Sequence, residues 1–262
     1  METVISIKHL CKTYRSGKYS NEVLKDISFD IQPGKIIGYI GPNGAGKSTT
    51  IKILSGILTD FTGEVTIQGM DIRTNALEIK RRIGYIPENA ALYEVLTPTE
   101  YLQFIGQLYG MKEDLIADKA QKLFHLFDLG EVGNQRMTTF SKGMKQKVLI
   151  ISGLIHNPEI IFLDEPLNGL DANSVMVVKE VIRQLAADGK TIFYSSHIMD
   201  VVEKISDRII LINDGKVIAD GTFSEISNAG GDTSLENLFS RLTGNEDHSA
   251  KAGEIINIFE KK

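Results

Sequence analysis

The chain has 262 residues, 42% of them hydrophobic and 24% charged, and its formal net charge at pH 7 is −5. These fractions are typical of a globular protein with a buried core, and the acidic balance excludes a protein that coats nucleic acid, which needs a basic stripe. A single cysteine, Cys11, excludes an internal disulfide and fits a reducing compartment.

The two ends of the chain carry little structural signal. The start lacks the features of a signal peptide, and no apolar run reaches the roughly 18 residues of a membrane span. We therefore expect a cytoplasmic protein, and any membrane span that it serves must belong to another polypeptide. We treat 244–262 as a C-terminal tail, because residues 244–254 are polar, and its role is left open.

Short β-rich segments come first in the chain. We expect strands over 4–7, over 23–31 with a break, over 35–40, and a strand pair over 63–72. The run 35–40 is apolar almost throughout, which predicts a buried strand. A glycine-rich loop and a helical stretch over 47–58 follow it.

The middle of the chain is helical. "TPTE" at 97–100 combines the N-cap Thr97, a proline in the first turn and Glu100 three residues after the cap, which predicts a helix start. Helical spacing continues to about residue 128. Another helix is expected after Ser141 in "FSKGMKQKV", because apolar residues recur at helical intervals beyond it.

Strands and helices alternate in the last part of the chain. We expect strands in "EIIFLDEP", "TIFYSSH" and "RIILIND", a helix over 172–187, and a hairpin around "NDGK". Strands that alternate with helices, joined to a helical insert, predict an α/β domain with a parallel sheet.

"GPNGAGKST" at 41–49 follows the expected buried strand and precedes a helix, so it fits a phosphate-binding loop in the required context. Gly41, Gly44 and Gly46 let backbone amides close around phosphate oxygens. Lys47 would reach the outer phosphates, and Ser48 can give its hydroxyl to magnesium.

"IIFLDEP" at 160–166 delivers two adjacent carboxylates to the end of an apolar strand, where α/β sheets bind ligands. Asp164 is the expected partner of magnesium. Glu165 is the candidate general base that orients the attacking water. The alternative is a strand that simply ends in solvent.

With "GPNGAGKST", "FSKGMKQ", "FLDEP", "LNGLD" and "SSH" in this order, the chain resembles the nucleotide-binding subunits of ABC transporters from about residue 4 to 244. The resemblance implies the P-loop NTPase fold of an ABC ATPase, with a parallel-sheet core, an N-terminal antiparallel β subdomain and a helical insert. One domain would span 1–243, with the insert at about 97–156. It also implies ATP and Mg²⁺ as cofactors, head-to-tail pairing of two subunits, and a separate transmembrane permease that holds them at the cytoplasmic face of the membrane.

The resemblance further assigns site residues by their positions in the motifs. His197 matches the switch histidine between the γ-phosphate and the catalytic glutamate, and Asp171 matches the loop that links the two sites. Tyr14 is the candidate that stacks on adenine, with Tyr19 as its competitor. Catalysis is assigned to Lys47, Glu165 and His197, and metal binding to Ser48, Glu88 and Asp164. The full ATP-binding set is Tyr14, Gly41, Asn43, Gly44, Ala45, Gly46, Lys47, Ser48, Thr49, Glu88, Ser141, Gly143 and Asp171.

Two motifs depart from the usual pattern of the family. The signature motif has Phe140, Lys142 and Met144 at variant positions. It keeps Ser141 and Gly143, which would contact the γ-phosphate held by the other subunit. Lys145 and Lys147 either add attraction or form a solvated face. Glu88 stands where glutamine is usual, so we expect it to bind metal and water with a steeper magnesium dependence.

The sequence therefore predicts the ATP-hydrolysing subunit of an exporter, acting as a homodimer beneath a permease and without nucleic acid. An importer subunit and a soluble ATPase that remodels ribosomes or DNA ends are the alternatives. The tandem cassettes, coiled-coil insert or basic arm typical of such remodelling factors are missing from this sequence.

Overall fold

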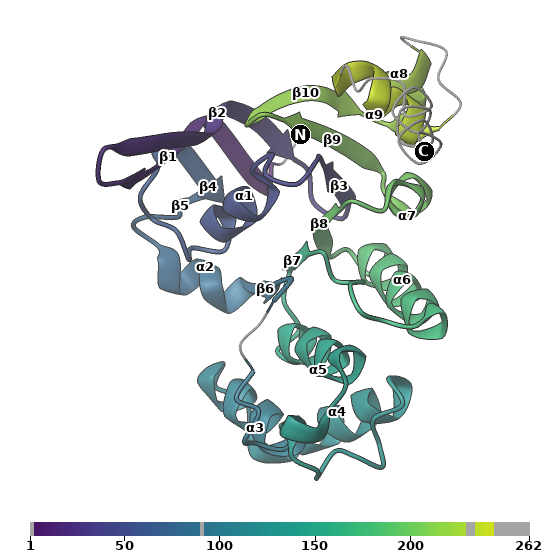
Figure 1. Ribbon diagram of the computed structural model, residues 1–262. Helices are drawn as coiled ribbons and strands as arrows, with labels where there is room; N and C mark the ends of the chain where they lie inside the picture. Colours follow the sequence, from purple (N-terminus) through teal and green to yellow (C-terminus); the bar gives the residue numbers. More distant parts are fainter. Residues whose placement is uncertain (1–2, 90–91, 229–233, 244–262) are drawn as a thin grey trace, which may run out of the picture.

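The computed structural model describes residues 3–89, 92–228 and 234–243. Two β-sheets lie in one half of the molecule, and the helices α3, α4 and α5 gather at the other end (Figure 1). The predicted tail 244–262 lies outside the described residues.

The first sheet is antiparallel, with the strand order β2-β1-β4-β5. Its strands are β1 (Ile5–Ser16), β2 (Tyr19–Ile31), β4 (Thr62–Ile67) and β5 (Met70–Asp71). The expected break in 23–31 is present, because Asp26 adopts a positive φ of 62° where the register of β1 and β2 shifts. The strand β2 begins earlier than the sequence suggested, since Gly17 at φ 58° turns the chain directly back at Tyr19.

The second sheet is parallel except for its edge strand β10, and its order is β10-β9-β3-β8-β7-β6. Its strands are β3 (Ile36–Ile40), β6 (Ile83–Ile86), β7 (Ile160–Asp164), β8 (Thr191–Ser196), β9 (Arg208–Asn213) and β10 (Lys216–Gly221). Every residue of β3, β7 and β8 is buried, as expected for strands covered on both faces. Because these strands are parallel, the loops after them meet at one edge of the sheet.

The helices pack around the parallel sheet and in the insert. They are α1 (Lys47–Leu54), α2 (Ala76–Arg82), α3 (Pro98–Leu108), α4 (Glu113–Leu126), α5 (Lys142–Leu154), α6 (Ala172–Ala187), α7 (Met199–Ile205), α8 (Phe223–Asn228) and α9 (Leu235–Thr243), with a 3-10 turn at Met137–Thr139. The helix α1 is shorter than the expected 47–58, because Gly56 at φ 66° ends it. The chain thus has the predicted architecture, with a parallel-sheet core, an antiparallel β subdomain and helices joined to them as an insert, and we propose 97–156 as the bounds of that insert.

Two caps that the sequence predicted hold the helices of the insert. Thr97 forms a complete capping box with Glu100 at the start of α3. The hydroxyl of Ser141 accepts a hydrogen bond from the backbone N–H of Met144, at 3.2 Å, and so caps α5. Both helices therefore begin where the sequence placed them.

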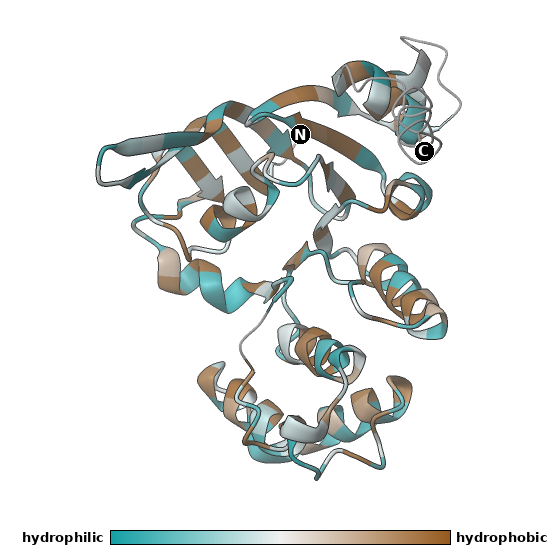
Figure 2. Cartoon of the chain, in the orientation of Figure 1, coloured by the Kyte–Doolittle hydropathy of each residue, from teal (hydrophilic) through white to brown (hydrophobic). Residues whose placement is uncertain are grey.

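Apolar residues run along the strands of both sheets and along the inner sides of the helices (Figure 2). One buried cluster joins one face of the parallel sheet to α5, α6 and the insert, and the other fills the space between the two sheets. In the described part of the chain, no helix combines the length and hydropathy that a membrane crossing requires.

Candidate functional site

The loop between β3 and α1 contains glycines at positions where the surrounding residues or the backbone conformation disfavour a side chain. Gly46 has a φ of 108°, and a Cβ there would lie 2.5 Å from a methyl carbon of Leu24. A Cβ on Gly41 would lie 2.2 Å from the carbonyl oxygen of Ile212. Gly44 also has a positive φ, 83°, but open space around it. The first two glycines are thus needed for packing and the third for backbone conformation.

Lys47 begins α1 and is only 7% exposed. Its ammonium donates to the carbonyls of Gly41 at 2.7 Å and Pro42 at 3.2 Å, within its own loop. Burial lowers the pKa of Lys47, and the carboxylates of Glu165, Asp164 and Glu88 act in the opposite direction. A buried cation that donates to carbonyls rather than to a carboxylate is well suited to meet a phosphate.

Asp164 lies at the end of β7 and is 2% exposed. One carboxylate oxygen accepts hydrogen bonds from the hydroxyls of Ser195, at 2.7 Å, and Ser48, at 3.1 Å. Ser195 of β8 thus stabilises the Asp164 carboxylate through a hydrogen bond that was not predicted from the sequence. The pairing of Asp164 with Ser195 in the parallel register of β7 and β8 explains their contact.

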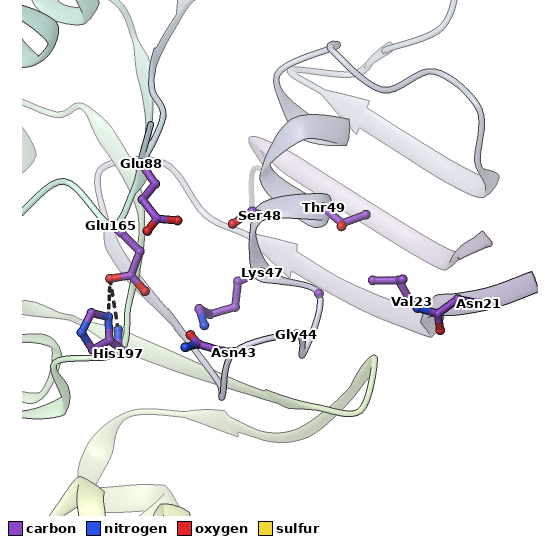
Figure 3. Close-up of a pocket in the computed structure, with 11 residues that line it drawn as sticks. Asn21, Val23, Asn43, Gly44, Lys47, Ser48, Thr49, Glu88, Glu165 and His197 are labelled. Atoms are coloured by element: carbon purple, nitrogen blue, oxygen red, sulfur yellow. Dashed lines mark hydrogen bonds and ion pairs between the residues drawn. The ribbon is translucent and has the colours of Figure 1, made fainter. Parts of the chain in front are cut away.

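Glu165 adopts a positive φ of 50° directly after β7 and is 6% exposed. Its Oε2 accepts from Nδ1 of His197 at 2.8 Å and from the His197 backbone N–H at 3.3 Å (Figure 3). With Glu165 as a carboxylate, which can only accept, Nδ1 of His197 is the donor in this contact. Both bonds use Oε2, so Oε1 is left for another partner.

Most of these groups line one cavity of about 600 Å³, whereas Gly41, Asp164 and Ser195 are not among its lining residues. The carboxylates of Glu88 and Glu165 point toward the side that carries Lys47 and Ser48 (Figure 3). The lining residues are Asn21, Val23, Asn43, Gly44, Gly46, Lys47, Ser48, Thr49, Glu88, Glu165 and His197. Nine of these were expected from the sequence, and the fold brings those nine together from four separate segments of the chain.

Asn21 and Val23 on β2 are lining residues that the sequence analysis missed. The predicted Tyr14 is not among the lining residues, although its strand register places it opposite Asn21. Tyr14 is 42% exposed, and its ring lies 4.9 Å from the ammonium of Lys12. Its role with adenine stays a prediction.

Ser141, Gly143 and Asp171 are also outside this cavity's lining. A Cβ on Gly143 would lie 2.8 Å from the carbonyl oxygen of Gly169, so the start of α5 packs closely on the loop after β7. Asp171 caps α6 by accepting from Ser174, and these hydrogen bonds hold its pKa at about 2. The signature motif and the loop at 167–171 therefore form a second unit beside the cavity.

The cavity's oxygen donors fit Mg²⁺. The carboxylate of buried Asp164 accepts a hydrogen bond from the Ser48 hydroxyl, so these two oxygen ligands lie side by side. Mg²⁺ prefers one or two such ligands together with phosphate oxygens and water. Among the described residues no group of three or more His, Cys, Asp or Glu side chains could hold a metal ion, and a magnesium site of this kind needs none.

Comparisons with known proteins identify this arrangement. The family model described as "ABC transporter" matches residues 24–168. The linearmycin resistance ATP-binding protein LnrL of Bacillus subtilis (strain 168) is 39% identical over 215 residues, which cover 82% of this chain and 69% of LnrL. The chain belongs to the ABC transporter family. It is an ATP-binding subunit that hydrolyses ATP for transport, as the motifs predicted.

Solved structures of ABC subunits share this fold. An ATP-binding subunit of an ABC transporter has a TM-score of 0.85 at 33% identity, covering 92% of this chain and all of that one. A dimeric post-hydrolysis state of the ATP-binding cassette MJ0796, bound to ADP and Pi, has a TM-score of 0.78 at 26% identity and covers 83% of this chain and 98% of that one. ABC cassettes of this kind can therefore pair.

Proposed function

We propose that this ABC subunit powers export through a separate transmembrane permease at the cytoplasmic face of the membrane, as one of two identical subunits closing head to tail on MgATP. One observation carries the pairing: the cavity contains Lys47 and Glu165 but not Ser141. Each chain thus offers one half of a site and, at the start of α5, a helix N-terminus suited to a phosphate of the other half. Identical chains satisfy both halves by symmetry.

The direction of transport is proposed from relatives and motifs. LnrL is by its name a resistance protein, and resistance to an antibiotic is commonly achieved by exporting it. The segments "SKGMKQ", "LNGLD" and "SLENLFSRLTG" and the residue Glu88 resemble the exporter branch of the family. We therefore place this chain with exporters rather than importers or soluble remodelling factors.

ATP binding in this proposal uses the loop after β3. The backbone amides of 43–49 would surround the phosphates, Lys47 would neutralise their charge, and Tyr14 would stack on the adenine. Ser48 and Asp164 would hold Mg²⁺, with Glu88 as a further oxygen ligand. The ion would supply charge neutralisation between the β- and γ-phosphates.

Hydrolysis is assigned to Glu165. Its Oε1 would take a proton from the attacking water while the oxygen of that water bonds to the γ-phosphorus and the bond to ADP breaks. His197 holds the Glu165 carboxylate through Oε2, and its ring would lie between this carboxylate and the γ-phosphate. Ser141 and Gly143 of the second subunit would stabilise the transferred group, and Asp171 would link the two sites.

The oligomeric state of Glu165→Gln, measured by light scattering with and without MgATP, tests this scheme. The substitution keeps the shape of the side chain but removes the base, so hydrolysis should fall by a factor of about 10² to 10⁴ and the closed pair should accumulate. Adding Ser141→Arg should abolish the pair, whereas Ser224→Arg, at an exposed residue of α8, should not. A Glu165→Gln protein that binds ATP and stays monomeric would overturn the cross-subunit role of Ser141.

We further propose that the permease docks where the insert meets the sheet. A groove of about 340 Å³ lies there, lined by Ser55, Ile57, Lys80, Ile83, Tyr85, Pro87, Tyr101, Ile105, Tyr109, Leu149, Ser152 and Gly153. Nearby, Tyr93 and Phe104 pack edge to face at 6.0 Å and remain 60% and 41% exposed. Exposed apolar groups that border a groove favour a protein partner.

Residues 92–96 are connected to the signature helix α5 by an ion pair. Glu94 forms an ion pair with Lys145 of α5 at 2.8 Å. We expect Tyr93→Ala and Val95→Ala to impair transport in vesicles that contain the permease, while the isolated subunit still hydrolyses ATP. Leu126→Ala, on exposed α4 and outside the groove lining, is the control. Unchanged transport would refute the docking assignment; Ala90 and Ala91 lie outside the described residues.

A further inference from the structure

The side chains of Glu88 and Asn168 meet across two neighbouring strands. β6 and β7 are parallel, with Ile86 opposite Leu163, so the segments that follow them start side by side. Nδ2 of Asn168 donates a hydrogen bond to Oε1 of Glu88 at 3.4 Å, in partly buried surroundings. The carboxylate that departs from the family pattern therefore has an amide donor beside it.

The turn that carries Asn168 is held in place on several sides. The Asn168 backbone N–H donates to the carbonyl of Glu165 at 3.2 Å, and buried Gln146 of α5 donates to the carbonyl of Pro166 at 3.1 Å. Leu167 between them is only 5% exposed. The amide of Asn168 is thus placed by the same turn that places Glu165.

Glu88 needs such a donor for electrostatic reasons. It faces a cavity that already contains the carboxylate of Glu165, with Asp164 behind Ser48. Like charges at short range repel, and a carboxylate without a donor would turn toward solvent. Lys47 donates its hydrogen bonds to the carbonyls of its own loop, so it attracts Glu88 through charge without donating a hydrogen bond to it.

We propose that Asn168 is a positioning residue that keeps the Glu88 carboxylate inside the cavity, and that this contact sets the Mg²⁺ concentration at which ATP is bound. The inference rests on the proposed role of the cavity as the MgATP site. The contact between Asn168 and Glu88 connects the segment after β6 to the turn that carries Glu165. The carboxylates of Glu88 and Glu165 therefore keep fixed positions relative to each other.

The test measures binding of a fluorescent ATP analogue against Mg²⁺ concentration in the Glu165→Gln background, where hydrolysis does not interfere. Because this hydrogen bond is long, at 3.4 Å, and only partly buried, its loss should count as that of an ordinary hydrogen bond, so Asn168→Ala should raise the half-saturating Mg²⁺ concentration about 3- to 10-fold. Asn168→Asp should have a larger effect, because it places a second carboxylate beside Glu88.

Reversing the pair is the decisive variant. The double variant Glu88→Gln with Asn168→Asp again contains one amide and one carboxylate, but the amide donor is now at position 88 and the carboxylate acceptor is at position 168. It should bring the half-saturating Mg²⁺ concentration back toward that of the parent, and Asn168→Ala should have no further effect once Glu88 is alanine. Asn134→Asp adds the same charge at an exposed position of the insert and should leave the value unchanged.

A second readout needs no nucleotide. Hydrogen exchange of the backbone amides of Ile86, Glu88 and Asn89 should speed up in Asn168→Ala and stay at the parent rate in Asn134→Asp. Parent-like exchange and parent-like Mg²⁺ dependence in Asn168→Ala would overturn the inference, as would simple additivity with Glu88→Ala. If instead the parent shows no Mg²⁺-dependent binding, the proposed site fails, and the exchange measurement still decides whether Asn168 holds Glu88.

Discussion

Replacing Ser195 by alanine removes a hydroxyl that supports the buried carboxylate of Asp164. Ser195 is fully buried and donates to Asp164 at 2.7 Å, while its hydroxyl also accepts from the Glu165 backbone N–H at 3.3 Å. After the change, Ser48 remains as a donor to Asp164 at 3.1 Å, and the Glu165 N–H keeps the Ser195 carbonyl at 3.2 Å. The loss is therefore concentrated on one charge-assisted bond.

A hydrogen bond to a buried charged group contributes about 1.5 to 3 kcal/mol, so we expect the free energy of unfolding to fall by that amount. The corresponding change in Tm is about 2 to 4 °C per kcal/mol for a chain of this size. Urea denaturation without nucleotide measures it. Ser55→Ala is the control, because the Ser55 hydroxyl bonds only carbonyls of its own helix turn. Ser55→Ala should lower the free energy of unfolding by about 1 kcal/mol or less.

The same stability in Ser195→Ala and Ser55→Ala would refute this reasoning. It would mean that the Asp164 carboxylate is satisfied without β8, by Ser48 or by water. A larger loss in Ser195→Ala that persists when Asp164 is also replaced by asparagine would place the effect on the Glu165 N–H instead. The double variant thus separates the two hydrogen bonds of one hydroxyl.

Two further predictions concern backbone geometry and pH. Gly46→Ala should abolish ATP binding and lower stability more than Gly44→Ala. Both residues have a left-handed φ, but only a side chain at position 46 would also clash with Leu24. Equal losses of stability in calorimetry would contradict this. Burial lowers the pKa of His156, which stacks on Tyr109 at 3.6 Å. In the unfolded chain His156 binds a proton near pH 6.5, whereas in the folded protein it binds one only at lower pH. The contribution of His156 therefore makes the free energy of unfolding fall as the pH drops below about 6.5. His156→Gln should flatten this dependence in denaturation curves between pH 7.5 and about 5, and an unchanged slope would assign it elsewhere.

The sequence predicted the elements whose signals are local. The loop at 41–49, the capping box of Thr97 and the cap at Ser141 depend on a few neighbouring residues, and each was found where expected. The acidic pair after β7 was also predictable, because a short apolar run that ends in two carboxylates is typical of a buried strand that reaches the ligand-binding edge of its sheet. Local chemistry thus specified most of the cavity.

Contacts between distant segments were not predictable in the same way. Asn21 and Val23 enter the cavity through the bulged register of β1 and β2, which no residue pattern announced. Ser195 faces Asp164 only because β7 and β8 are neighbours. Lys145 was left between attraction to phosphate and a solvated face, and it instead pairs with Glu94. Such partners follow from strand order and helix packing, which a single sequence does not encode locally.

The turn after Glu165 connects the cavity mechanically to the signature helix. The carbonyl of Pro166 is bonded by buried Gln146, and the carbonyl of Gly169 touches Gly143 so closely that no side chain fits between them. A turn held at both points cannot shift without moving the first turn of α5, because packed interiors transmit displacement rather than absorb it. In the proposed pair, a movement of Glu165 toward the γ-phosphate would therefore also move Ser141 relative to the opposite subunit. The paired sites would then close together rather than independently.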